Sequence, residues 1–300
     1  QFYIRALSIA LPVMAQLLIQ NFVSLIDNFM VAGLGDIKMA GVNVAGMLIF
    51  VFLILVNTIC AAGGIFMSQF NGAKDKEGMQ QSLRFKLLLT GFAGIVFVIV
   101  GLIAPRNLFG IMLTINKDAD VIIDQAVKYS RAVAFSGLFT VFSQSIASSL
   151  REIEIVRPPL IISIIATLVN TFFNWIFIYG NLGAPRLEVE GAGIATVIAR
   201  AVELVLFIIY AVVKKPPFLF NIFKLFEIKI HLFGTIIKKS TMILYSELTW
   251  AVSETVSNAL YNTRGGAEVV SGMSAGFAIA NLFFICFGGI HTSINVIIGS

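Results

Sequence analysis

Charged residues are scarce in this chain. They make up 12% of its 300 residues, whereas apolar residues make up 58% and the mean hydropathy is +0.93. Soluble domains carry about 25% charged and about 45–50% apolar residues, so this composition excludes an ordinary soluble fold. The sequence therefore predicts a polytopic membrane protein.

The residue types that build metal and redox sites are also scarce. Cys60 and Cys286 lie in apolar runs without the spacing of a metal or disulfide motif, and His231 and His291 are far apart. No nucleotide-binding loop is visible, which argues against an ATP-driven pump. We therefore expect no enzyme, no cofactor and no nucleic-acid partner.

Long apolar runs dominate what is present. About 20 apolar residues are needed for a helix to cross a bilayer, and eight segments satisfy this length. Their apolar character is continuous rather than alternating, which favours helices over barrel strands. The fold class expected is all-α, with eight transmembrane helices. These helices are predicted at 6–33, 42–69, 85–104, 121–149, 158–180, 191–213, 238–262 and 268–300.

The basic residues predict an orientation. Thirteen Lys and Arg residues, with Arg84 and Lys86 among them, fall at the ends and loops of one side, and five fall on the other. Because Lys and Arg are enriched in cytoplasmic loops, the N-terminus is predicted to be cytoplasmic.

One segment differs from the rest. Residues 214–237 begin with Pro216-Pro217 after two lysines and then mix apolar side chains with further lysines, so they are too charged to span. We predict an amphipathic helix on the inner leaflet. This linker would divide a six-helix lobe at 1–213 from two further helices at 238–300.

A weak internal repeat supports that division. Two windows offset by 230 residues share an apolar helix, a short Gly-containing turn and a second apolar helix, and transporters are commonly built from such repeats. The identical pairs are Asn28 with Asn258, Gly35 with Gly265 and Gly46 with Gly276. The chain also begins without Met and stops inside an apolar run, so we expect a fragment.

Asp27 is the most informative single residue. It ends a stretch from Ala6 to Ile26 that contains no charge, and it precedes the end of the apolar segment. A carboxylate inside a membrane helix costs about 2.5–3.5 kcal/mol on insertion scales, and such residues usually serve a function. We predict that Asp27 binds a coupling cation.

Several short motifs, in order along the chain, resemble those of the multidrug and toxic-compound extrusion (MATE) family, bacterial type. The match runs over essentially the whole chain. The motifs are Leu11-Pro12 with Asp27-Asn28-Phe29-Met30-Val31-Ala32-Gly33-Leu34-Gly35, Gln69-Phe70-Asn71-Gly72-Ala73-Lys74-Asp75, Leu150-Arg151 with Arg157-Pro158-Pro159, Asn170-x-x-x-Asn174, Gly191-Ala192-Gly193-Ile194-Ala195-Thr196 and Tyr245-Ser246-Glu247-Leu248-Thr249-Trp250.

The resemblance implies a twelve-helix fold in two lobes, of which this chain would be the N-terminal two-thirds. Carried over by motif, the cation site would comprise Asp27, Asn170, Asn174 and Thr196. Glu247 becomes a candidate for substrate or proton contact. Repacking of the first helix near Pro12 would make that residue a hinge.

The residue types themselves fit this site. Asn170 and Asn174 are four residues apart and share a helix face. One carboxylate with neutral oxygens suits a monovalent ion. Many family members have Asp-Pro where this chain has Asn174-Trp175, which leaves Asp27 as the only carboxylate of the set. Na⁺ and H⁺ therefore both stay open, and Asn170 and Asn174 would serve equally well to hydrogen-bond neighbouring helices.

The function that follows is cation-coupled export of amphipathic, often cationic, organic compounds by alternating access. We expect a monomer in the bacterial inner membrane, with the lipid bilayer and small-molecule drugs as partners. A lipid or lipid-linked oligosaccharide flippase is an alternative, disfavoured by the few intramembrane cations. An intramembrane enzyme or receptor is a second alternative, but no convergent catalytic set supports it.

Overall fold

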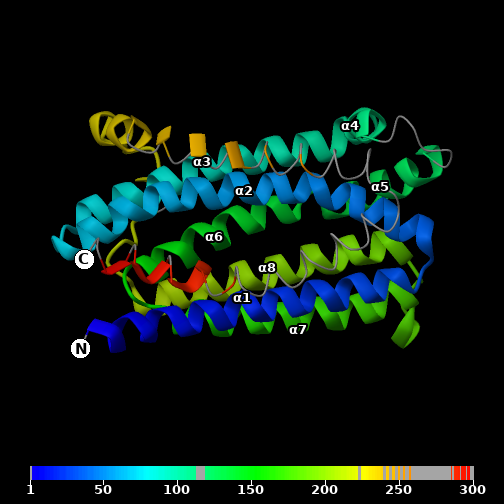
Figure 1. Ribbon diagram of the computed structural model, residues 1–300, viewed down its shortest axis with the longest axis horizontal. Coiled ribbons are helices and arrows are strands. Elements are labelled where there is room, and N and C mark those ends of the chain that lie inside the picture. Colours follow the sequence, from blue (N-terminus) through cyan, green and yellow to red (C-terminus); the bar gives the residue numbers. More distant parts are fainter. Residues whose placement is uncertain are drawn as a thin grey trace.

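A computed structural model describes residues 2–112, 119–221 and 224–238, with scattered residues between 241 and 297 (Figure 1). The described residues form a bundle of helices without strands. The prediction of an all-α membrane protein is confirmed. The α-helices are α1 (Phe2–Ala32), α2 (Asp36–Gly72), α3 (Lys76–Ile103), α4 (Pro105–Met112), α5 (Ala119–Val133), α6 (Ser136–Glu152), α7 (Arg157–Tyr179) and α8 (Glu188–Lys214).

The helices form two groups that face each other across the bundle. In one group α1 packs on α7 and α7 packs on α8, and in the other α2 packs on α3. Helices α5 and α6 join the groups, because each contacts α8 as well as α2 or α3 (Figure 1). Helix α1 meets α2 only sparsely, so a space remains between the two groups.

Of the six spans predicted within 1–213, four are single helices long and apolar enough to cross a bilayer, and a fifth is a bent pair. Helices α2, α3, α7 and α8 are each long and apolar enough to cross a bilayer. Helix α1 has 31 residues, and its apolar part is Ala6–Ile19. The two spans predicted at 238–262 and 268–300 lie almost wholly outside the described residues.

The span predicted at 121–149 is not one continuous helix. It is divided into α5 and α6, which are bent by 53° relative to each other, and together they count as a broken span. The break precedes the pair Ser136-Gly137, a combination that often accompanies sharp kinks. Gly137 also lies directly against the ring of Phe97, where a Cβ atom would be only 2.5 Å from a ring carbon.

The linker is only partly helical, so the predicted amphipathic helix is wrong over its first half. Helix α8 ends at Lys214; the next residue, Lys215, has a left-handed backbone (φ 46°), and Pro216-Pro217 cannot continue the helix. None of the described residues from 215 to 229 lies in an α-helix, and helix resumes over 230–238.

This irregular segment is bound to the start of α3. Gln81 Nε2 and Arg84 Nη1 both donate to the carbonyl oxygen of Glu227, at 3.0 and 2.7 Å, and Lys229 N donates to Gln81 Oε1 at 3.2 Å. Phe218 is fully buried in the core beside Met67, Met79, Leu150 and Phe207. The linker is therefore part of the packed lobe.

Lys86 lies inside the lobe, whereas the sequence placed it at a cytoplasmic loop. Its side chain is fully buried, forms an ion pair with Glu152, and donates to Ser148 Oγ and Ser149 Oγ at 3.0 and 3.2 Å. Gly64 makes room for the Glu152 carboxylate. The pair joins α2, α3 and α6 near the end of the lobe that carries the linker.

Candidate functional site

Three helices bring the predicted site residues together. Asp27 lies one and a half turns before the end of α1, Asn170 and Asn174 share a face of α7, and Thr196 lies in the third turn of α8. Asn170 and Asn174 are buried, with 7% and 2% exposure. Asp27 and Thr196 are half-buried.

Hydrogen bonds link all four side chains. Asn174 Nδ2 donates to Asp27 Oδ1 at 2.7 Å and to Asn170 Oδ1 at 3.2 Å. Asn170 Nδ2 reaches Thr196 Oγ1 at 3.5 Å, and Thr196 Oγ1 donates to the carbonyl oxygen of Ala192 at 3.0 Å. The four residues therefore form one polar cluster across α1, α7 and α8.

The amide of Asn170 occupies a position of conflict. Its terminal atom nearest the carboxylate lies 2.9 Å from Asp27 Oδ2, 3.1 Å from Asp27 Oδ1 and 3.2 Å from Asn174 Nδ2. If this atom is the amide oxygen, it accepts a hydrogen bond from Asn174 but lies against the negative carboxylate of Asp27. If it is the amide nitrogen, it donates to the carboxylate but lies against the amide nitrogen of Asn174. A proton on Asp27, or a cation beside it, satisfies the oxygen orientation.

A second oxygen in the cluster lacks a donor. Asn174 Oδ1 is buried and has no hydrogen-bond partner among the described residues. A buried, unpaired carbonyl oxygen costs about 1–3 kcal/mol, so such atoms in proteins are usually explained by an unseen partner. The cluster thus combines one carboxylate with a buried amide oxygen that has no donor among the described residues, a combination that suits a small cation.

Backbone packing holds the three helices in register. Tyr179 Oη donates to the carbonyl oxygen of Met30 at 2.9 Å and so ties the end of α7 to the end of α1. On α8, a Cβ atom at Gly191 would lie 2.6 Å from Phe177 O, and one at Gly193 would lie 2.5 Å from Ala132 Cβ. These two glycines let α8 approach α7 and α5, which places Thr196 beside Asn170.

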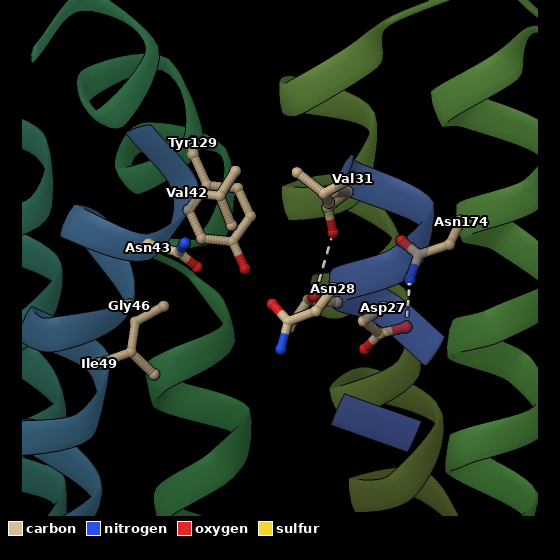
Figure 2. Close-up of a pocket in the computed structure, with 11 residues that line it drawn as sticks. Asp27, Asn28, Val31, Val42, Asn43, Gly46, Ile49, Tyr129 and Asn174 are labelled. Atoms are coloured by element: carbon tan, nitrogen blue, oxygen red, sulfur yellow. Dashed lines mark hydrogen bonds between the residues drawn. The ribbon is translucent and has the colours of Figure 1, made fainter. Parts of the chain in front are cut away.

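Two cavities meet at the cluster. The first, about 330 Å³, lies between α1 and α2, with Asn28 and Val31 facing Val42 and Asn43 across it (Figure 2). The second, about 410 Å³, extends between α7 and α8 on one side and α2, α3 and α6 on the other. Both cavities are lined by Asp27, Ile49, Tyr129 and Thr196.

Sequence reasoning missed two residues of these cavities. Tyr129 lies on α5 across from Asp27, and Figure 2 shows its hydroxyl pointing into the first cavity. Arg200 lines the second cavity one turn beyond Thr196. Its ion pair with Glu203, three residues later on the same helix, is one that local spacing allows, but that spacing does not indicate access to the cavity. Their positions depend on packing between distant helices, and no local pattern marks either residue.

The other predicted residues stand apart from the cluster. Pro12 lies inside α1, about four turns before Asp27, and interrupts the helix hydrogen bonding there. Glu247 lies outside the described residues.

Comparison with known protein families shows which family the chain belongs to. The MatE family model matches residues 12–176, which include Asp27, Asn170 and Asn174. The chain belongs to the MatE family. The resemblance drawn from the sequence is thereby confirmed.

Several bacterial multidrug resistance proteins are similar to this chain in sequence. The chain is 27% identical to the multidrug resistance protein NorM of Vibrio cholerae over 221 residues, covering 74% of this chain and 47% of the relative. It is 26% identical to NorM of Vibrio vulnificus strain YJ016 over 209 residues, covering 68% and 44%. The chain thus spans about half the length of the curated relatives it matches.

Solved structures show the same fold. An outward-facing multidrug resistance MATE family transporter of the MOP superfamily superposes with a TM-score of 0.85 at 21% identity, covering 97% of this chain and 63% of the other. A MOP superfamily transporter from Pyrococcus furiosus gives a TM-score of 0.84 at 21% identity, covering 96% and 62%. At this identity the likeness concerns the fold alone.

Proposed function

We propose that this MatE protein exports amphipathic organic compounds in exchange for a monovalent cation that binds at Asp27. The observation that supports the proposal is the cluster of Asp27, Asn170, Asn174 and Thr196, in which one carboxylate lies against the Asn170 amide and the buried Asn174 amide oxygen has no donor among the described residues. The multidrug resistance proteins among its relatives support drug-like substrates.

Both Na⁺ and H⁺ suit the cluster. A proton on Asp27 would donate to Asn170 Oδ1, and Na⁺ would be coordinated by the same oxygens, while Thr196 Oγ1 would accept from the Asn170 amide nitrogen and hold the Asn170 oxygen toward the ion. Hard monovalent ions favour such carboxylate, carbonyl and hydroxyl oxygens. In either case the bound ion would fix the Asn170 amide with its oxygen toward Asp27.

Exchange would follow from the position of Asp27 in both cavities. An organic cation in the second cavity and an ion in the cluster would be drawn to the same carboxylate, so each would weaken binding of the other. Movement of one charge through 100 mV supplies about 2.3 kcal/mol. That free energy would drive a neutral substrate outward.

The bundle also offers a place for the conformational step. Proline at position 12 removes the hydrogen bond to the carbonyl of Ser8, which lowers the stiffness of α1 there. Similar solved MATE structures are described in a bent and in a straight conformation, so the fold exists in two forms. We infer that ion binding at Asp27 favours one bend of α1 over the other.

The wider setting is part of the same proposal. Residues 1–213 would form the first lobe, 214–237 the cytoplasmic linker and 238–300 the first helices of the second lobe. The protein would act as a monomer in the bacterial inner membrane, with its N-terminus in the cytoplasm.

The proposal is tested by ethidium export into everted membrane vesicles. Asp27→Asn keeps the shape of the side chain but removes its charge, and we expect it to abolish ion-driven export while leaving insertion intact. Asp36→Asn is the matched control, because Asp36 is an exposed carboxylate at the start of α2. Export at the native rate by the Asp27→Asn variant would rule the mechanism out.

A further inference from the structure

The second cavity carries charges of both signs. Asp27 lies where it meets the first cavity, and Arg200 lines its wall on α8. A cavity built only for organic cations would gain nothing from a guanidinium in its wall.

The hydrogen bond to Glu203 occupies only part of the Arg200 guanidinium. Its Nη1 donates to Glu203 Oε2 at 2.7 Å, and the Glu203 side chain is buried at 6% exposure and lies outside the cavity lining. The Arg200 side chain keeps 35% exposure. Because a guanidinium has five N–H donors in one plane, the edge turned away from Glu203 is available to a ligand.

The positions of Thr196 and Arg200 on α8 indicate which kind of ligand would fit the second cavity. Thr196 and Arg200 are one helical turn apart, so Arg200 continues the line of the ion cluster into the second cavity. Neutral side chains that accept and donate hydrogen bonds share its wall, among them Thr140, Gln144 and Thr167. A ligand with a positive group at Asp27 would reach Arg200 with an anionic group at its other end.

We propose that Arg200 is a specificity residue that selects amphipathic zwitterions, compounds that carry a carboxylate as well as a cationic nitrogen. The inference rests on the export function proposed above and names its substrate class. An Arg–carboxylate pair forms two parallel hydrogen bonds, and it replaces the water that a carboxylate loses on entering a cavity at membrane depth. The carboxylate would approach the free edge of the guanidinium while Glu203 holds the opposite edge.

Two dyes that differ at one group separate this idea from general cation binding. Rhodamine 110 carries a free carboxylate, and rhodamine 123 is its methyl ester. Binding of each dye to purified protein is followed by fluorescence anisotropy. The native protein is expected to bind the acid more tightly than the ester.

The variants are chosen so that the fold survives. Arg200→Gln alone leaves Glu203 as an unpaired buried charge, so the test uses Arg200→Gln with Glu203→Gln, compared with Glu203→Gln alone. We expect about a tenfold loss of affinity for rhodamine 110, since a hydrogen bond to a charged group is lost, and less than a twofold change for rhodamine 123. Arg106→Gln, at an exposed arginine paired with Asp124, is the control and should change neither affinity.

Equal loss of both dyes, or no loss of either, would overturn the role of Arg200. So would equal binding of acid and ester by the native protein. Rhodamine 123 that is bound in an Asp27-dependent manner would still support the export function in those cases. Failure of the substrate inference is thus distinguished from failure of the transport proposal.

Discussion

The Asn174 amide nitrogen lies 2.7 Å from an Asp27 carboxylate oxygen, although 147 residues separate the two in the chain. This bond joins α1 to α7 at the point where both cavities meet. The same amide nitrogen also donates to Asn170, so a change in the charge of Asp27 is felt directly by two neighbouring side chains.

Replacing Asn174 by Asp should turn the site into a proton-binding pair. Two carboxylates at hydrogen-bond distance cannot both remain ionised, so the pair is expected to hold about one proton at neutral pH in the absence of Na⁺. Proton uptake by purified protein, measured as Na⁺ is removed, checks this. Asn181→Asp, in the loop after α7, is the control and should take up none. Unchanged uptake in Asn174→Asp would place the residue outside the ion site.

The Thr196 hydroxyl should contribute to ion affinity. Thr196→Val keeps the volume but removes the oxygen that meets Asn170, and we expect about a fivefold to tenfold weaker apparent affinity for the coupling ion. Thr196→Ser keeps the hydroxyl and should stay within twofold of the native value. Ion dependence of ethidium export gives both numbers. If Val and Ser variants behave alike, the hydroxyl has no part in ion binding.

Pro12→Ala should separate binding from transport. Alanine restores the hydrogen bond to the Ser8 carbonyl and stiffens α1, so we expect slower export with dye affinity unchanged. Leu11→Ala is the neighbouring control, because Leu11 is exposed and its change leaves the helix hydrogen bonding intact. Native export rates in Pro12→Ala would show that α1 does not bend there.

Lys86 and Glu152 should stabilise the folded protein only when both charges are present. Lys86→Met leaves the Glu152 carboxylate buried and unpaired, at an expected cost of about 3–5 kcal/mol in the free energy of unfolding. Adding Glu152→Gln should recover much of that loss. Thermal unfolding followed by circular dichroism measures both variants, and additive losses would mean that the two charges are not coupled.

Replacing Gln81 by Ala should weaken the packing of the linker on α3. Gln81→Ala removes two hydrogen bonds to the linker, and we expect hydrogen exchange over residues 224–233 to increase about tenfold. Gln69→Ala, at an exposed glutamine on α2, serves as the control. Identical exchange in the two variants would show that Gln81 does not hold the linker.

Local sequence patterns predicted three of the four residues of the polar cluster. A carboxylate inside an apolar run is conspicuous, which identified Asp27, and four-residue spacing put Asn170 and Asn174 on one face. Thr196 came from the resemblance to a family, since a threonine in a helix has no pattern of its own. The structure brings these four side chains together.

The residues that sequence could not place depend on contacts between distant helices. Lys86 follows a turn and reads as a loop lysine, but its partner Glu152 lies 66 residues later. Tyr129 and Arg200 line the cavities together with residues from distant helices, and no local pattern predicts that arrangement. The linker lost its predicted helix for the same reason, because α3 satisfies its backbone groups instead.

The close approach at Gly191 and Gly193 has a consequence for genetics. Any larger residue at these two positions would push α8 away from α7 and α5. A library covering every position of α8 and selected on an antibiotic should therefore lose every larger side chain at Gly191 and Gly193, in addition to the losses expected at Thr196 and Arg200. Because Gly191 meets α7 and Gly193 meets α5, these losses would show that α8 is packed closely on two different sides.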